Sequence, residues 1–457
     1  MSKCFAQPAD AVIRQKTEQL WHSTAYFAVL LAVVAVSMAL GTVIPATVLL
    51  VLCCTWMLVF CRDFLAAVLP FLLIFLLSTL EYDNLSVFLP CAPLAIFLAA
   101  GLIVHLLRWP VPLRVGSSTV GWVLVSAATL LGGAGVISKA DYFAPLSLYY
   151  TLGLGVGLLA CYVLLFSELS VPRDYDLLHK LMQMLYALGL TMVLAIGFFY
   201  VHHWALFSEH WILPRISYRN FAATILVSTL PAVFYMALKN LRHLAVVVLW
   251  AAALFFSGSR SALLFGGLML LLGLIYLARR NALPLWALVL TVAIAGSIVT
   301  FYGDEIYAFF VGARENQDQF INPNEDRLLL LAQGREDFLA HPLLGIGLGN
   351  SQNTVLFDGV PGSMVFYHNA VMQVLGSMGL VGAIAYSVLL YSQVRLLVRR
   401  QDGCRVVTFF FLGMLLVSMT NPGVFCPLPN ALLTVIVLTV LEVITDSSAI
   451  AARSPHL

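Results

Sequence analysis

The sequence predicts an all-α, polytopic integral membrane protein with about 12–14 transmembrane helices. The first observation is composition: 61% of the 457 residues are hydrophobic and only 10% are charged, and the mean hydropathy is +0.96. The second is the order of the segments. Apolar runs of near-membrane length follow one another along the chain, and only one long polar segment, residues 302–368, interrupts them. We therefore expect no soluble domain of any size.

The apolar runs give about fourteen candidate spans, each near the ~20 residues that a helix needs to cross a bilayer. They are centred near Val33, Val51, Leu73, Phe97, Val125, Leu154, Leu190, Val227, Val248, Met269, Val292, Ala385, Phe411 and Ile436. The first span follows Arg14 and Lys16, and it is long for the core of a signal peptide. Because many spans follow it, we expect an uncleaved first helix.

Basic residues set the orientation of these spans. If the N-terminus lies in the cytoplasm, seventeen of the 24 Lys and Arg residues also lie there. The other seven fall on the outer side: Lys139, Arg215, Arg219, Arg260, Arg314, Arg327 and Arg335. Cytoplasmic loops of membrane proteins are enriched in Lys and Arg, so this asymmetry predicts that both termini are cytoplasmic. It also places the long polar segment outside.

The sequence gives little sign of a metal or disulfide site. The eight cysteines fall mostly in spans or on the predicted cytoplasmic side, and they form no spaced framework in an outer loop. His202, His203 and His210 lie in one outer segment, but adjacent histidines cannot readily share one face, and no Cys or acidic residue completes a zinc-like set. We therefore predict no metal and no cofactor.

The long outer segment contains a predicted helix and a glycine-rich turn. Residues 326–339 carry leucines at helical spacing, which predicts an amphipathic helix against the membrane face. His341-Pro342 ends this helix, and Leu-Leu-Gly-Ile-Gly-Leu-Gly-Asn follows at 343–350. Long loops in compact folds are usually functional, so we expect this segment to contribute to a site.

The segment ends at Phe366-Tyr367-His368-Asn369, directly before an apolar helix. At ~100° per residue, Gly379 shares the face of His368 and Gly382 lies close to it, so we expect a glycine track that another helix can approach. The partial positive charge of a helix N-terminus disfavours imidazolium and keeps a histidine able to accept a proton. The alternative is that His368 is simply a helix-start residue at the membrane interface.

Two short outer segments carry arginines against the topological bias. They are Pro-Arg-Ile-Ser-Tyr-Arg-Asn-Phe-Ala at 214–222 and Ser-Gly-Ser-Arg-Ser-Ala at 257–262. A guanidinium is permanently charged and offers a planar fork of donors that matches phosphate oxygens, so Arg215, Arg219 and Arg260 are candidates for binding a pyrophosphate. The alternative is that each anchors the protein to lipid headgroup phosphates.

Four blocks in order resemble the O-antigen ligase, O-antigen polymerase and O-oligosaccharyltransferase superfamily: Arg-Asn-Phe-Ala, Ser-Arg-Ser-Ala, His-Pro-Leu-Leu-Gly and His-Asn-x9-Gly-x-x-Gly. The resemblance covers residues 215–421. It implies an inverting, metal-independent glycosyltransferase of the bacterial inner membrane, with its active site facing the periplasm and membrane lipids around it. The donor would be an undecaprenyl-pyrophosphate-linked glycan and the acceptor the lipid A–core oligosaccharide, with no nucleic-acid partner.

The resemblance also implies roles for individual residues. His368 would be the general base, and Arg215, Arg219 and Arg260 would bind the donor pyrophosphate. Which of Arg215 and Arg219 does so stays open, because this chain departs from the usual Asn-Pro-Asn-x-Phe-Ala pattern there. The supporting residues would be Asn369, Arg327 and His341.

The implied organisation has four parts: N-terminal transmembrane helices (1–200), transmembrane helices with arginine-bearing periplasmic ends (201–301), the long periplasmic loop (302–368) and C-terminal transmembrane helices (369–457). Three alternatives stay open. An O-antigen polymerase would use another lipid-linked repeat unit as acceptor, and a protein O-oligosaccharyltransferase would use a serine hydroxyl. A lipid or polysaccharide flippase would need a basic cavity reaching both leaflets and would not need His368.

Overall fold

The computed structural model of the chain describes residues 9–80, 82–205, 218–284, 323–350, 367–400, 402–420, 423–425 and 428–453, with isolated positions between 286 and 304 and at 352. These residues form helices and no β-strand, which confirms the all-α class. The α-helices are α1 (Ala9–His22), α2 (Thr24–Ala39), α3 (Ile44–Phe60), α4 (Leu65–Leu80), α5 (Ala95–Arg108), α6 (Thr119–Gly132), α7 (Pro145–Thr151), α8 (Leu158–Leu169), α9 (Leu177–His202), α11 (Arg219–Lys239), α12 (Leu244–Phe256), α13 (Arg260–Arg279), α15 (Pro323–Ala340), α16 (Ala370–Arg399), α17 (Arg405–Ser418) and α18 (Leu428–Arg453). The 3-10 helices are η1 (Tyr82–Leu94), η2 (Ala140–Tyr142), η4 (Leu241–His243) and η5 (Asp402–Cys404), and η3 (Leu152–Gly157) is a π-helix.

Among the described residues, seven helices are long and apolar enough to cross a membrane. The pair α1 and α2, bent by 80°, would make an eighth, and five further apolar helices are shorter. The chain is therefore a polytopic membrane protein. Each predicted span centre lies in a helix, except Val292, which is outside the described residues. The described positions from Trp286 to Asp304, on either side of it, are helical.

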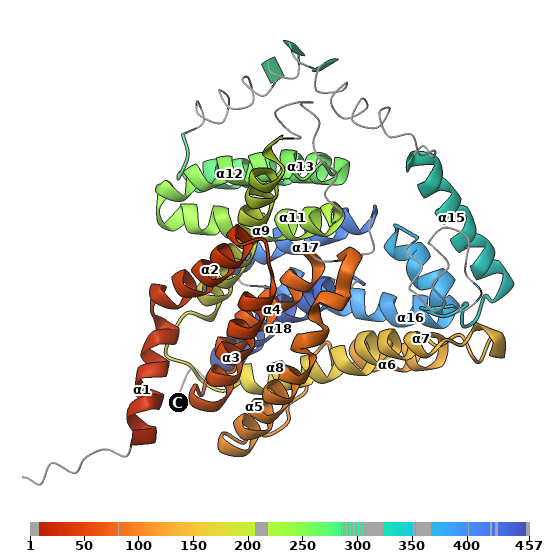
Figure 1. Cartoon of the computed structure of the whole chain (residues 1–457), viewed down its shortest axis with the longest axis horizontal. Coiled ribbons are helices and arrows are strands. Elements are labelled where there is room, and N and C mark those ends of the chain that lie inside the picture. Colours follow the sequence, from red (N-terminus) through yellow and green to blue (C-terminus); the bar gives the residue numbers. More distant parts are fainter. Residues whose placement is uncertain are drawn as a thin grey trace, which may run out of the picture.

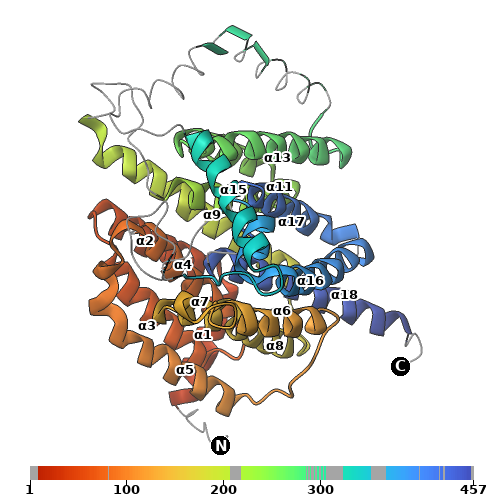
Figure 2. The same ribbon diagram turned by 90° about the vertical axis from the view of Figure 1, so that its right-hand side faces the viewer.

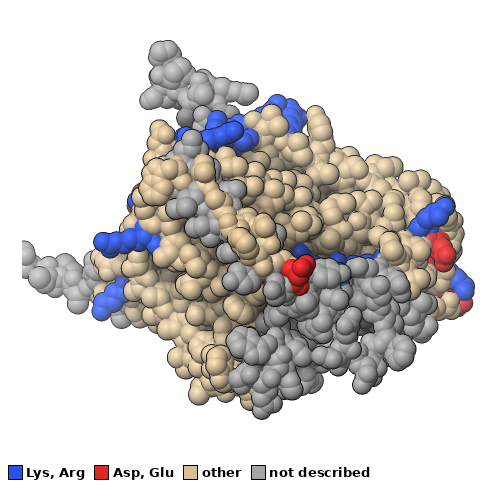
Figure 3. All heavy atoms as spheres, turned by 90° about the horizontal axis from the view of Figure 1, so that it is seen from above, with Lys and Arg blue, Asp and Glu red and all other residues tan. Residues whose placement is uncertain are grey.

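The helices pack around α11, which is buried along nearly its whole length. It lies against α9, α12, α13 and α17, while α16 packs on α6, and α3 packs on α4 and α5. Figure 1 shows α15 at the opposite end of the molecule from α1, and Figure 2 shows α15 running across the bundle from the region of α13 to α16. On the face drawn in Figure 3, acidic and basic side chains lie in a few small groups on a mostly uncharged surface, as expected of a protein embedded in lipid.

The predicted helix in the long outer segment is confirmed as α15. Its inner face carries Leu330 and Gly334, which are buried. Leu328, Leu329 and Leu339 are exposed, so α15 presents apolar side chains outward as well. These exposed leucines fit a helix that also touches the membrane surface.

Helix α16 is broken at Gly379, whose backbone has φ +59° and ψ −155°. The segment after α15 fills the break. The N–H groups of Ile346 and Gly347 donate to the carbonyl oxygens of Gly376 and Ser377, at 2.9 and 3.0 Å. On the other side of the break, two N–H groups of α16 donate back to the segment, Leu380 to Pro342 and Val381 to Leu343, at 2.8 and 3.1 Å.

The prediction of a continuous glycine track for a neighbouring helix is therefore wrong at Gly379. Its positive φ ends the first half of α16, and the chain that approaches it closely is the Leu343–Leu344 backbone, not another helix. The physical reason is that backbone groups at membrane depth must find partners within the protein. A Leu-Gly-rich segment can enter the break and supply them.

Buried polar side chains join several helices. His105 in α5 and Glu168 in α8 are both buried, with the imidazole Nε2 3.8 Å from the Glu168 Oε1. Glu442 in α18 accepts hydrogen bonds from the Ser117 hydroxyl and the Ser118 N–H, at 2.7 and 2.9 Å. This carboxylate therefore lies at the N-terminus of α6, where the helix dipole favours a negative charge. Such polar contacts tie helices together where lipid provides no hydrophobic driving force.

We expect Gly379→Ala to destabilise the protein, because a Cβ would overlap the backbone of Leu343 and because the φ and ψ of Gly379 lie in a region that costs a non-glycine residue about 1–3 kcal/mol. The thermal midpoint of the purified protein in detergent should fall by several degrees. Gly197→Ala in α9 is the matched control, since a Cβ there meets no atom within 4 Å and alanine favours a helix. Equal midpoints for the two variants would contradict this account of the break.

Candidate functional site

His368 directly precedes α16 and has a left-handed backbone, with φ +52°. It is half-buried. The next residue, Asn369, is the N-cap: its side chain accepts hydrogen bonds from the N–H groups of Val371 and Met372 at 2.9 and 3.1 Å. The Asn369 amide also donates to the carbonyl oxygen of Met419 at the end of α17, at 3.2 Å. Asn369 therefore fixes the helix start beside His368 and links it to α17.

Tyr367 anchors the other side of His368. Its side chain is 1% exposed. The hydroxyl donates to Asp337 Oδ2 of α15 at 2.6 Å, and the backbone N–H donates to Gln373 Oε1 at 3.2 Å. Gly334 of α15 and Gly376 of α16 border the ring, because a Cβ on either would lie about 3 Å from ring carbons. The missing side chains of these two glycines make the slot for the tyrosine ring.

The carboxyl of Asp337 is a perturbed acid within this contact. Burial raises its pKa, and the hydrogen bonds from Tyr367 and Gln333 partly oppose that shift by favouring the charged form. The Gln333 amide donates to Asp337 Oδ1 at 2.8 Å. For Tyr367, burial and then the adjacent Asp337 carboxylate raise the pKa well above its usual value, so its hydroxyl stays protonated and acts as a donor.

Two of the predicted arginines lie close together. Arg327, half-buried on α15, has its pKa lowered first by burial and then by the positive charge of Arg260. Arg260 is the first residue of α13 and is exposed. Arg219 is half-buried and is the first residue of α11, while Arg215 lies outside the described residues. A helix N-terminus disfavours a cation, so arginines at the starts of two helices are costly unless they face an anion.

These residues lie at one end of the bundle. Arg327 of α15 is near enough to Arg260 of α13 for that charge to lower its pKa, and the Tyr367–Asp337 hydrogen bond links α15 to the start of α16. The chain after α17 then leads back to α11, because a Cβ at Gly423 would lie 3.2 Å from Thr224 Cγ2. The starts of α11, α13 and α16 thus share one region, which α15 crosses (Figure 2).

A family model described as O-antigen ligase matches residues 245–387. This match supports the resemblance of the chain to the O-antigen ligase family. The matched segment holds Arg260, Arg327, His341, His368 and Asn369, whereas Arg215 and Arg219 precede it. The family implies a ligase- or polymerase-type glycosyltransferase activity. No curated protein and no solved structure matches the chain.

His341 contacts a residue between α6 and α7. Its Nε2 is 3.0 Å from the hydroxyl of Tyr142, the last residue of η2. The next residues enter the break of α16, so His341 fixes the point at which the chain leaves α15. Among the residues that the structure describes, no group of three His, Cys, Asp or Glu side chains could hold a metal ion. Metal independence stays a prediction from the resemblance.

Sequence reasoning missed Asp337 and Gln373, the two partners of Tyr367. Their contacts join positions far apart in the chain, and the only local sign was that Tyr367 stands beside the motif histidine.

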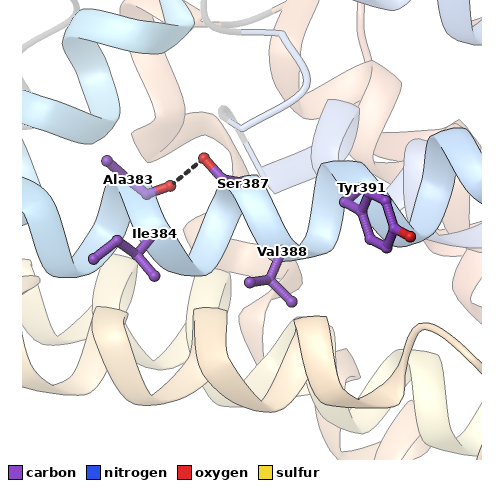
Figure 4. A pocket seen from close by; sticks show the side chains of 5 residues that line it. All are labelled: Ala383, Ile384, Ser387, Val388 and Tyr391. Atoms are coloured by element: carbon purple, nitrogen blue, oxygen red, sulfur yellow. Dashed lines mark hydrogen bonds between the residues drawn. The ribbon is translucent and has the colours of Figure 1, made fainter.

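The structure also shows a shallow apolar groove on the second half of α16, lined by Ala383, Ile384, Ser387, Val388 and Tyr391 (Figure 4). The Ser387 hydroxyl there donates to the carbonyl oxygen of Ala383 at 2.7 Å, so the lining offers little polar chemistry.

We expect Asp337→Asn to stabilise the protein increasingly as pH rises. A raised folded-state pKa means that the folded protein holds this proton more tightly than the unfolded chain, whose value is near 3.8. Below the unfolded-state pKa, the Asp337 carboxyl therefore does not lower the free energy of unfolding. It lowers that free energy increasingly as pH rises through the folded-state pKa. An asparagine oxygen can still accept from Tyr367.

The measurement is the thermal midpoint of both proteins from about pH 4 to pH 8. The difference in favour of Asp337→Asn should grow with pH and then level off. A constant difference, or one that favours the native protein more at high pH, would show that the Asp337 pKa is not raised.

Proposed function

We propose that this protein is an O-antigen ligase of the bacterial inner membrane. It transfers a glycan from undecaprenyl pyrophosphate to a sugar hydroxyl of the lipid A–core oligosaccharide, on the periplasmic side. The observation that carries the proposal is the arrangement along α15. Arg327, whose pKa is lowered by burial and by the charge of Arg260, lies toward one end, and Asp337, which accepts from the tyrosine beside His368, lies toward the other. The proposed anion-binding arginines Arg260 and Arg327 and the candidate base His368 therefore all lie within the segment that matches the family model.

The arginines bind the donor. We assign donor binding to Arg260 and Arg327, together with either Arg219 or Arg215, because guanidinium groups bind phosphate oxygens through paired N–H donors. A pyrophosphate would offset the repulsion between Arg260 and Arg327. The same charges stabilise the leaving group as the glycosidic bond breaks, so no divalent cation is required.

His368 activates the acceptor. The hydroxyl oxygen attacks the anomeric carbon while its proton passes to the imidazole. The bond from that carbon to the pyrophosphate oxygen breaks, and undecaprenyl pyrophosphate leaves with the electron pair. Attack from the face opposite the leaving group inverts the anomeric configuration. Asn369 supports this step from the N-cap, where it holds the start of α16 beside the histidine.

The distribution of basic residues supports a periplasmic site with both termini in the cytoplasm. Residues predicted to be cytoplasmic gather around α1: Arg108 of α5 contacts Asp10, at 2.7 Å, and Lys180 of α9 donates to the carbonyl oxygen of Trp21, at 2.8 Å. Helix α15 lies at the opposite end (Figure 1). The candidate site would then face the side on which lipid-linked glycans are transferred.

The choice of acceptor tests the function. The purified protein in lipid nanodiscs should transfer glycan from a synthetic undecaprenyl-pyrophosphate donor to lipid A–core, and mass spectrometry would detect the product. Transfer only to a second lipid-linked repeat unit would identify a polymerase, and transfer only to a serine peptide would identify a protein O-oligosaccharyltransferase. Movement of donor across proteoliposome membranes without any transfer would support a flippase.

We expect His368→Ala to lower the turnover number about 10²–10⁴-fold, the usual contribution of a general base. Binding of the donor, measured with a fluorescent analogue, should stay close to that of the native protein because the arginines are intact. His368→Gln separates two roles: substantial activity in this variant would mean that His368 only hydrogen-bonds a substrate. Unchanged turnover in correctly folded His368→Ala would exclude both roles.

A further inference from the structure

We propose that Asp337 and Tyr367 are positioning residues for His368: through the hydrogen bond between α15 and the start of α16, they hold the histidine backbone in its left-handed conformation. Neither side chain need touch a substrate. The proposal rests on the proposed role of His368 as a base, and it extends that role to two residues outside the motif.

The need for such a device follows from the backbone of His368. A φ of +52° is uncommon for a residue with a side chain, and it costs free energy relative to the right-handed conformation. Such a conformation persists only where the surroundings fix it on both sides. At His368, the left-handed turn sets the direction in which the imidazole leaves the chain just before α16.

Asn369 fixes the C-terminal side through three hydrogen bonds, two within α16 and one to Met419. Tyr367 fixes the N-terminal side. Its ring is buried in the slot between Gly334 and Gly376, and its N–H and O–H groups are bonded to two different helices. His368 is thus held between two anchored neighbours.

The partners of Tyr367 are themselves held. Gln373 is completely buried, and its amide lies 3.3 Å from the Ser377 hydroxyl, one turn further along α16. Asp337 accepts from Gln333 on its own helix and from Tyr367, so its two oxygens have separate donors. A half-buried carboxylate with two fixed donors has little freedom to move, which makes it an effective anchor.

Removal of the Tyr367 hydroxyl oxygen tests whether Tyr367 and Asp337 position His368. Tyr367→Phe keeps the ring in its slot and deletes only the bond to Asp337. We expect the turnover number to fall about 10- to 100-fold, the effect of a small misplacement of a reacting group, with little change in donor binding. Tyr391→Phe is the matched control on the same helix, because its side chain is 67% exposed in the apolar groove.

Two further variants separate positioning from a general loss of structure. Asp337→Asn retains an oxygen that can accept from Tyr367 and should keep most of the activity, whereas Asp337→Leu should behave like Tyr367→Phe. Adding Tyr367→Phe to His368→Ala should cause no further loss, because the tyrosine acts through the histidine. A full second loss in the double variant would overturn the proposal.

A readout without turnover keeps the test independent of the proposed function. The rate at which diethyl pyrocarbonate modifies His368, followed by mass spectrometry with His202 as the internal reference, should change in Tyr367→Phe and not in Tyr391→Phe. Unchanged modification in both Tyr367→Phe and Asp337→Leu would also overturn the proposal. If the native protein transfers glycan to no acceptor, the proposed function fails, while the modification rates still decide whether His368 is positioned as inferred.

Discussion

The hydrogen bonds between the 342–348 segment and the two halves of α16 are the interactions on which the rest of this end of the molecule depends. A helix interrupted at membrane depth leaves N–H and C=O groups that lipid cannot satisfy. The segment after α15 satisfies groups on both sides of the break, and its Leu348 N–H also donates to Gly133 after α6, at 2.7 Å. The first half of α16, with His368 at its start, is therefore held against α6 and α15 together.

The sequence predicted the helices well because each span is a local pattern: thirteen of the fourteen centres lie in described helices. It also indicated His368 as a candidate site residue, since a polar motif before an apolar helix is a local signal too. The break at Gly379 was missed because its partners come from residues 342–347, and helical spacing alone assumes an unbroken helix. The Tyr367–Asp337 bond was missed for the same reason: it joins positions thirty residues apart through tertiary packing.

Two features near the candidate site lower the stability of the fold. His368 has a left-handed backbone, and Asp337 is a half-buried acid with a raised pKa. Elsewhere, buried groups are placed favourably, as Glu442 is at the start of α6. Local departures from the most stable choice often gather where a protein binds or reacts.

Arg327 and Asp337 both lie on helix α15, so the helix fixes their relative positions. Ten residues separate them, so at ~1.5 Å per residue the helix sets a spacing of about 15 Å along its axis. The length of this helix would then fix the distance between the proposed phosphate-binding group, Arg327, and the proposed positioning group, Asp337. Insertion of a single residue between them would turn one end by ~100° relative to the other, so the relative phase of the two ends constrains how this segment can change in evolution.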